Sequence, residues 1–184
     1  MKKVRIDDIL EKKTLIIGEV KRGKTRLTAE LLDQLLKRTA PENITVIDMA
    51  PTGIDKVGGM LWKYTKAVFR VRYLQPSSIR APRIEGRSKE EVLSLANSNR
   101  LAIEPLIECF LKHPSSSLVI NDLSIYLQSG DLEGILRCMG LSDTVVSNAY
   151  YGSSLSNDKD SNISLREKQL VDELIAKNEI VIRL

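Results

Sequence analysis

Short apolar runs alternate along the chain with segments whose apolar residues recur at helical spacing. Residues 14–17 form an apolar run that predicts a buried strand. The leucines of 25–36 fall three and four residues apart, which predicts an amphipathic helix. The runs at 44–48 and 117–122 predict two further strands, each ending in a carboxylate.

The rest of the chain continues this alternation. Further strands are predicted at 67–73, 143–149 and 179–184, and further helices at 88–112, 132–139 and 164–177. Capping boxes mark the starts of the first and last of these helices, at Ser88 with Glu91 and at Ser164 with Glu167. Pro105 is expected to kink or divide the helix that contains it.

The alternation predicts an α/β fold of three layers (α/β/α), in which helices cover both faces of a mainly parallel sheet. The length of 184 residues suits one domain spanning residues 1–184. Two segments are predicted to be loops. Residues 75–91 contain several arginines, and residues 151–163 are rich in glycine, serine and asparagine and are expected to be flexible.

The composition is that of an ordinary globular protein, with a formal net charge of +4. That charge permits an anionic ligand without establishing nucleic-acid binding. Cys109 and Cys138 are expected to be buried free thiols, and with the single histidine, His113, they argue against a zinc site. No signal peptide or apolar run of about 20 residues is visible, which predicts a cytoplasmic protein without membrane contact.

One motif lies between the first predicted strand and the first predicted helix. Gly18 is followed, after four residues, by Gly23, Lys24 and Thr25, which is the G-x-x-x-x-G-K-[ST] pattern (Walker A) of a phosphate-binding loop. Strand, glycine loop and helix is the context that this pattern needs, because free N–H groups at a helix start attract anions. The alternative is a glycine-bounded turn ahead of a basic helix start.

The residue types in this motif predict a site for ATP and Mg²⁺. Gly18 and Gly23 allow the backbone to approach phosphate oxygens, Lys24 would reach the β- and γ-phosphates, and the Thr25 hydroxyl would take one Mg²⁺ position. The other residues expected to bind the nucleotide are those of the loop and the first helical turn, namely Glu19, Val20, Lys21, Arg22 and Arg26.

Polar residues end three further predicted strands. In open α/β sheets ligands bind at the carboxyl ends of the strands, so these residues are expected to share one site. Asp122 is the better candidate for a Mg²⁺ ligand, and Asp48 is its rival, which could also contact a substrate or polarise a water. Asn148 falls at the same edge. Either aspartate could instead cap a turn.

With the phosphate-loop motif and the LVIND run that ends in Asp122, the chain resembles the P-loop NTPases of the RecA-like branch over most of its length. The resemblance implies that Asp122 meets the metal through a water and that Asn148, or Ser147 in competition with it, senses the γ-phosphate. In that branch a glutamate commonly follows the aspartate and activates water, whereas Leu123 follows it here, which implies slow hydrolysis. The candidate catalytic residues are Lys24, Asp48, Asp122 and Asn148.

A weaker similarity joins the runs VIDMAPTG, YLQPSS and LVIND to the polynucleotide 5′-hydroxyl kinase family, although the DxDxGQ run of that family is not intact. Arg80, Arg83 and Arg87 lie in the long predicted loop, and Arg70 and Arg72 alternate along the strand before it, so that they would share one face. Such arginines could close over a nucleotide or grip a second phosphate-bearing substrate. They could equally form a solvated basic surface.

Three functions therefore remain open. The first is a slow ATPase that acts as a nucleotide-dependent switch with a protein partner or within a homo-oligomer. The second is a phosphotransferase that moves the γ-phosphate of ATP to a small-molecule or nucleic-acid hydroxyl. The third is a non-hydrolysing nucleotide-binding subunit. ATP is favoured over GTP because the guanine-reading order N-K-x-D is scrambled at 157–160.

Overall fold

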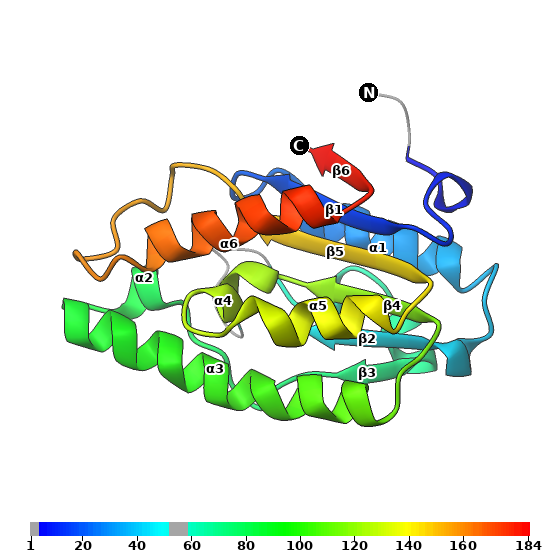
Figure 1. Cartoon of the computed structure of the whole chain (residues 1–184), viewed down its shortest axis with the longest axis horizontal. Helices are drawn as coiled ribbons and strands as arrows, with labels where there is room; N and C mark the ends of the chain where they lie inside the picture. Colours follow the sequence, from blue (N-terminus) through cyan, green and yellow to red (C-terminus); the bar gives the residue numbers. More distant parts are fainter. Residues whose placement is uncertain (1–3, 52–58) are drawn as a thin grey trace.

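A six-stranded sheet, in which every pair of neighbouring strands is parallel, forms the centre of the molecule (Figure 1). The computed structural model describes residues 4–51 and 59–184. The strands are β1 (Lys13–Gly18), β2 (Ile44–Asp48), β3 (Arg72–Leu74), β4 (Ser117–Asn121), β5 (Thr144–Tyr150) and β6 (Ile180–Arg183). Their order across the sheet is β3-β2-β4-β5-β1-β6, with β3 and β6 at the edges.

Helices cover both faces of this sheet, which confirms the predicted three-layer α/β/α arrangement (Figure 1). The α-helices are α1 (Lys24–Leu35), α2 (Pro82–Glu85), α3 (Lys89–Lys112), α4 (Leu123–Leu127), α5 (Leu132–Gly140) and α6 (Ile163–Lys177). Short 3-10 helices form at Ile6–Asp8, Pro41–Asn43, Leu61–Lys63 and Ala67–Arg70. One face packs against α1, and the other packs against α3, α5 and α6.

Two apolar cores result, one on each face of the sheet. Leu15 and Ile17 point to the core beneath α3, α5 and α6, whereas Ile16 points to the core beneath α1. This alternation follows from the two-residue period of a strand. Because helices cover both faces, both sets of side chains must be apolar, which explains the continuous apolar runs in the sequence.

The strand order decides which residues can share a site. Strand β5 lies between β1 and β4, and Gly18 at the end of β1 pairs with Tyr150 at the end of β5. At the next pairs along the sheet, Ile120 of β4 lies opposite Ser147, and Asp48 of β2 lies opposite Asn121. The carboxyl ends of four strands therefore meet at one edge, where the first helix also begins.

The prediction of a strand over 67–73 was wrong for its first half. Ala67–Arg70 is a 3-10 helix whose Ala67 and Val68 are buried in the core beneath α1, and only Arg72–Leu74 joins the sheet. Arg70 and Arg72 therefore do not share a strand face. The Arg72 guanidinium instead donates to the carbonyl of Cys109, 2.8 Å away, and to that of His113, at the carboxyl end of α3.

Two predicted helix starts met different outcomes. Ser88 caps α3 as expected, since its hydroxyl accepts the N–H of Glu91 at 3.3 Å. The predicted capping box at Ser164 was wrong, because α6 begins one residue earlier and follows Asn162 in a left-handed conformation. Glu167 is buried and pairs with a side chain instead of the backbone.

Two further segments differ in part from their predictions. Helix α3 runs undivided through Pro105, so the proline does not break it. The predicted loop 75–91 contains the short helix α2, whose first residue is Pro82, a position that suits the fixed φ of proline. Cys109 and Cys138 are both free thiols, although Cys109 is only partly buried.

The segment between β5 and α6 contains neither strand nor helix before Ile163, but it is attached to its surroundings by hydrogen bonds. The Glu19 carboxylate accepts the N–H groups of Ser153 at 2.6 Å and Ser154 at 3.4 Å. It lies so close to Gly152 that a Cβ there would meet its oxygen at 1.2 Å. The loop after β1 and the loop after β5 are therefore joined through one carboxylate.

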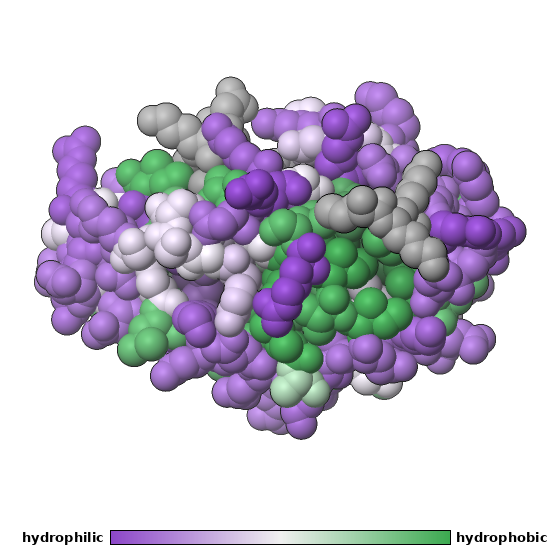
Figure 2. Space-filling model, turned by 90° about the horizontal axis from the view of Figure 1, so that it is seen from above, coloured by the Kyte–Doolittle hydropathy of each residue, from purple (hydrophilic) through white to green (hydrophobic). Residues whose placement is uncertain are grey.

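The side of the molecule that carries the edge strand β6 is partly apolar. Figure 2, which looks onto this side, shows an apolar patch surrounded by polar surface.

Among the described residues, no helix has both the length and the hydropathy needed to cross a membrane.

Gly18 is a position where packing excludes a side chain. A Cβ on Gly18 would lie 2.4 Å from the backbone oxygen and 3.2 Å from the backbone carbon of Leu184, so the end of β6 would have to shift. We expect Gly18→Ala to lower the free energy of unfolding by about 1–3 kcal/mol. The matched control is Gly140→Ala at the end of α5, where a Cβ meets nothing within 4 Å and the change should be neutral or mildly stabilising. Urea unfolding followed by circular dichroism measures both, and equal stability of the two variants would contradict this account.

Candidate functional site

A turn of five residues connects β1 to α1 and opens onto the carboxyl edge of the sheet. Its backbone is left-handed at Lys21 (φ 61°) and at Gly23 (φ 91°, ψ 12°). Gly23 is the N-cap of α1, and glycine adopts this conformation without the strain that a Cβ brings. Helix α1 therefore starts at Lys24, and among the described residues no side chain caps its free N–H groups with a hydrogen bond.

A cavity of about 450 Å³ lies against the start of α1. One wall consists of residues from the turn and the first helical turn, namely Val20, Lys21, Gly23, Lys24, Thr25 and Arg26. The rest of the lining includes Arg83 and Ile84 of α2, Ile125 of α4 and Tyr150 of β5. Most of the predicted nucleotide-binding segment thus faces one cavity, although Gly18, Glu19 and Arg22 are not among the described residues that line it.

Lys24 is partly buried beside this cavity. Its ammonium donates hydrogen bonds to the carbonyl oxygens of Gly18 at 2.8 Å and Glu19 at 2.6 Å, and it lies 5.9 Å from the centre of the Tyr150 ring. Burial lowers the pKa of Lys24, and the nearby charge of Asp122 opposes that change. The ammonium is therefore a desolvated cation held at the mouth of the turn.

Asp122 lines the same cavity as Lys24 and interacts with its charge. It follows β4 in a left-handed conformation (φ 61°, ψ 54°), and both Asp122 and Thr25 line the cavity. Burial raises the pKa of Asp122 to about 6, whereas the charge of Lys24 lowers it. Among the described residues no side chain or backbone group donates a hydrogen bond to its carboxylate, so its oxygens are available to a ligand.

A carboxylate and a hydroxyl on one cavity fit a hard cation. Asp122 and Thr25 supply oxygen atoms, which are the donors that Mg²⁺ prefers. In the described parts of the chain no three His, Cys, Asp or Glu residues come together as a metal cluster. Mg²⁺ does not need one, because it usually takes one or two protein oxygens and completes its shell with phosphate oxygens and water.

Asp48 lies outside this cavity and is completely buried. Its carboxylate accepts hydrogen bonds from the Tyr73 hydroxyl at 2.7 Å, the Asn121 amide at 2.7 Å and the Leu61 N–H at 2.6 Å. Burial raises the pKa of Asp48, while these donors lower it. The carboxylate is thus occupied by internal partners, and its predicted role as a metal ligand stays a prediction.

Asn148 lines the cavity, but its amide is also fully used by neighbours. It donates to the Thr28 hydroxyl at 2.8 Å and to the Asn121 side-chain oxygen at 2.7 Å. Its own oxygen accepts the N–H of Asp122 at 3.1 Å. Asn148 therefore positions the Asp122 backbone, and its predicted contact with a γ-phosphate stays a prediction. Ser147 donates to the Thr14 carbonyl and is buried away from the cavity.

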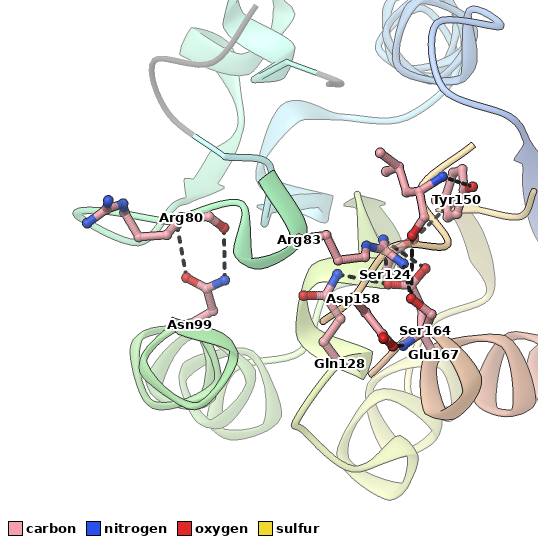
Figure 3. A network of polar contacts seen from close by, with 10 residues as sticks. Arg80, Arg83, Asn99, Ser124, Gln128, Tyr150, Asp158, Ser164 and Glu167 are labelled. Carbon is pink, nitrogen blue, oxygen red and sulfur yellow. Dashed lines mark hydrogen bonds and ion pairs between the residues drawn. The ribbon is translucent and has the colours of Figure 1, made fainter. Parts of the chain in front are cut away.

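The arginines of the 75–91 segment differ sharply from one another (Figure 3). The Arg83 side chain is only 6% exposed and pairs with both oxygens of Glu167, at 2.9 and 3.1 Å. Arg80 pairs with Glu85 at the surface, and Arg87 is exposed. Burial raises the pKa of Glu167 to about 7, and the charge of Arg83 opposes this rise. Arg80 and Arg87 thus lie at the surface and Arg83 lines the cavity, and contact of these arginines with a nucleotide or a second substrate stays a prediction.

Sequence reasoning missed three polar residues near the cavity. Tyr150 lies two residues after Asn148 on β5, so the strand period alone would have placed both on one face. Gln128 lines the cavity and donates to Glu167 at 2.8 Å, and nothing in its local sequence signals this. Glu167 looked like part of a capping box, which concealed its position.

The order and direction of the strands, with helices on both faces, define a RecA-like α/β fold. The chain is similar to the crystal structure of the flagellar accessory protein FlaH from Methanocaldococcus jannaschii, with a TM-score of 0.55 and 11% sequence identity over 100% of this chain and 77% of that chain. At this identity the likeness shows the fold alone.

A second solved structure, from Pyrococcus horikoshii OT3, has a TM-score of 0.39 and 6% identity over 91% of this chain and 84% of that chain, too low to support any inference. Neither a protein family nor a curated protein matches the sequence.

Asp122 gives a pH-dependent prediction. Because its pKa is raised from 3.8 to about 6 in the folded protein, folding takes up protons, and the free energy of unfolding falls as the pH rises between these values. Asn cannot ionise, so Asp122→Asn should become more stable than wild type by about 1–3 kcal/mol above pH 6, relative to pH 4. Urea unfolding at a series of pH values measures this difference.

The control for this series is Asp7→Asn. Hydrogen bonds from Arg38 and Arg5 lower the pKa of Asp7, so its contribution has the opposite sign. That variant should lose stability relative to wild type as the pH rises through the acidic range. A stability difference for Asp122→Asn that does not change with pH would show that burial does not oppose ionisation of Asp122.

Proposed function

We propose that the protein binds ATP with Mg²⁺ at the cavity beside α1 and hydrolyses it slowly, as a nucleotide-dependent switch. The observation that carries this proposal is the convergence of Lys24, Thr25 and Asp122 on one cavity at the uncapped start of a helix, in a RecA-like fold. Free N–H groups and the helix dipole favour an anion there. The sequence pattern of residues 18–25 is the one expected for a phosphate-binding loop.

Each residue has a distinct role in this proposal. The Lys24 ammonium exchanges its two carbonyl partners for phosphate oxygens, which are stronger acceptors because they carry charge. Thr25 and Asp122 would hold Mg²⁺, directly or through water, and Mg²⁺ would neutralise charge on the phosphates. Asn148 fixes the backbone of Asp122, so that the carboxylate stays aimed at the cavity.

Slow turnover follows from the groups on this cavity. Asp122 is the one carboxylate among the described residues that line it, and a Mg²⁺ ligand is poorly placed to act as a base as well. The next residue, Leu123, is completely buried and apolar. A second group that orients the attacking water is therefore proposed to come from a protein partner or another copy of the chain, which is what makes the protein a switch.

The direct test is isothermal titration with a non-hydrolysable ATP analogue and Mg²⁺. Lys24→Ala should weaken binding more than tenfold, because it removes a charge-assisted contact to the phosphates. The control is Lys177→Ala, a change at an exposed lysine in the last turn of α6 that is not among the residues lining the cavity, and it should leave affinity unchanged. Equal affinity of wild type and Lys24→Ala would refute the proposal.

Phosphotransfer is a second candidate, favoured by the extent of the cavity. Beyond the start of α1, the cavity continues to an apolar wall that includes Ile84, Ile125 and Leu155, with Ser124 and Gln128 between these residues. This mixture of apolar and polar groups is typical of small-molecule sites. A hydroxyl-bearing acceptor could occupy that part while ATP occupies the turn.

Labelled ATP separates the two candidates. Incubation of the protein with γ-labelled ATP, Mg²⁺ and pools of metabolites or 5′-hydroxyl oligonucleotides should give only slow release of inorganic phosphate if the protein is a switch. Label that appears on an acceptor, and disappears with Lys24→Ala, would favour phosphotransfer. Binding without either product would identify a non-hydrolysing subunit.

A further inference from the structure

Arg83 occupies an unusual position for an arginine. Its side chain is 6% exposed, and its guanidinium lies 5.2 Å from the centre of the Tyr150 ring. The Lys24 ammonium lies 5.9 Å from the centre of the same ring. Two cations, one from α1 and one from α2, therefore lie near one aromatic side chain in the cavity beside the start of α1.

The partner of Arg83 is equally buried. Glu167 is 3% exposed at its side chain and accepts two hydrogen bonds from the guanidinium. Removing two charges from water is costly, and a buried ion pair often stabilises a fold no more than apolar side chains of the same size. Fold stability alone therefore explains this buried pair poorly. Binding of an anion in the cavity that Arg83 lines explains the arginine better.

The charges of this pair act on the site described above. The charge of Arg83 lowers the pKa of Asp122, and the charge of Glu167 raises that of Lys24. These four groups share one electrostatic environment, with two cations and two carboxylates. A phosphate that enters would bring further negative charge, and Mg²⁺ would meet Asp122, so that Arg83 is left as the cation opposite Lys24.

We propose that Arg83 contacts the terminal phosphate of the bound nucleotide, and that Glu167 is the internal anion that holds the guanidinium while that phosphate is absent. The inference rests on the proposed function, because it needs a nucleotide in the cavity. It adds a phosphate-contacting residue and a competing carboxylate from α2 and α6, outside the sequence motif. ATP and ADP are then distinguished by whether Arg83 has an anion other than Glu167.

The backbone around Arg83 is fixed, so a change of partner is a side-chain movement. The N–H of Ala81 donates to Glu85, and the backbone of Arg80 exchanges two hydrogen bonds with the Asn99 side chain, at 2.9 and 3.0 Å (Figure 3). Glu167 also keeps a partner when the guanidinium turns away, because Gln128 donates to it at 2.8 Å. The exchange therefore leaves no carboxylate without a hydrogen bond.

The other arginines of this segment do not meet these conditions. Arg80 is 54% exposed and paired with Glu85 outside the cavity lining, and Arg87 is exposed. They serve as controls because they lie within four residues of Arg83 and carry the same charge. Glu85 is the matching control for Glu167, since it pairs with an arginine at the surface.

Affinities for ADP and for a β,γ-imido ATP analogue, each measured with Mg²⁺ by isothermal titration, test the inference. Arg83→Ala should weaken binding of the analogue about tenfold and change the affinity for ADP less than twofold, because only the analogue has the terminal phosphate. Arg83→Lys should lose part of that affinity, because an ammonium lacks the guanidinium fork. Arg80→Ala should leave both affinities unchanged.

Glu167→Gln gives the sharper result. It removes the competing charge while retaining size and hydrogen bonding, so the analogue should bind about threefold to tenfold more tightly than to wild type, with little change for ADP. Glu85→Gln should have no such effect. A purely structural ion pair predicts the reverse, because its loss can only loosen the site. Circular dichroism and the unfolding midpoint confirm that each variant is folded.

The results for the Lys24, Arg83 and Glu167 variants separate this inference from the proposed function on which it rests. Loss of binding of both nucleotides in Lys24→Ala would support the ATP site. If Glu167→Gln then binds the analogue with unchanged or lower affinity, the inference about Arg83 is overturned and the ATP site stands. Equal losses of ADP and analogue in Arg83→Ala would overturn it as well. If Lys24→Ala changes neither affinity, the proposed function fails, and the inference fails with it.

Discussion

A buried chain of hydrogen bonds across the carboxyl ends of the strands is the feature on which the site depends. It runs from Thr28 of α1 to Asn148 of β5, then to Asn121 of β4 and on to Asp48 of β2. Tyr73 of β3 completes it through the second oxygen of Asp48. Buried polar groups that lose a partner cost about 1–3 kcal/mol each, so every link fixes the next. The chain therefore holds the start of α1 and the end of β4 in one relative position.

This arrangement explains how the regular geometry of a parallel sheet becomes a particular site. The strand order brings the ends of β1, β5 and β4 together. The chain of hydrogen bonds fixes the backbone of Asp122, because the Asn148 side-chain oxygen accepts the Asp122 N–H. Lys24 and Thr25 follow from the turn after β1. The sheet therefore places the residues of the site. Asn148, which the sequence suggested as a ligand-binding residue, makes internal hydrogen bonds that position its neighbours.

The sequence predicted the layers, the parallel sheet and most elements because apolar runs and helical spacing report burial directly. It failed at 67–73, where tertiary burial of Ala67 and Val68 beneath α1 overrides a strand-like alternation. It also failed at Ser164, where a capping-box pattern coincides with a buried ion pair. The motif residues Lys24, Thr25 and Asp122 were brought to one cavity, but the partners of Arg83 come from residues more than 80 positions away, and no local pattern encodes such a contact.

The contact between Glu19 and the backbone at Gly152 ties together two positions separated by more than 130 residues. A side chain at position 152 would displace the Glu19 carboxylate, which would then give up its hydrogen bonds to the N–H groups of Ser153 and Ser154. A substitution at either position therefore detaches the loop after β1 from the loop after β5 chiefly through the loss of these hydrogen bonds. One side chain thus links two loops that are far apart in the sequence, and a single substitution is enough to release them from each other.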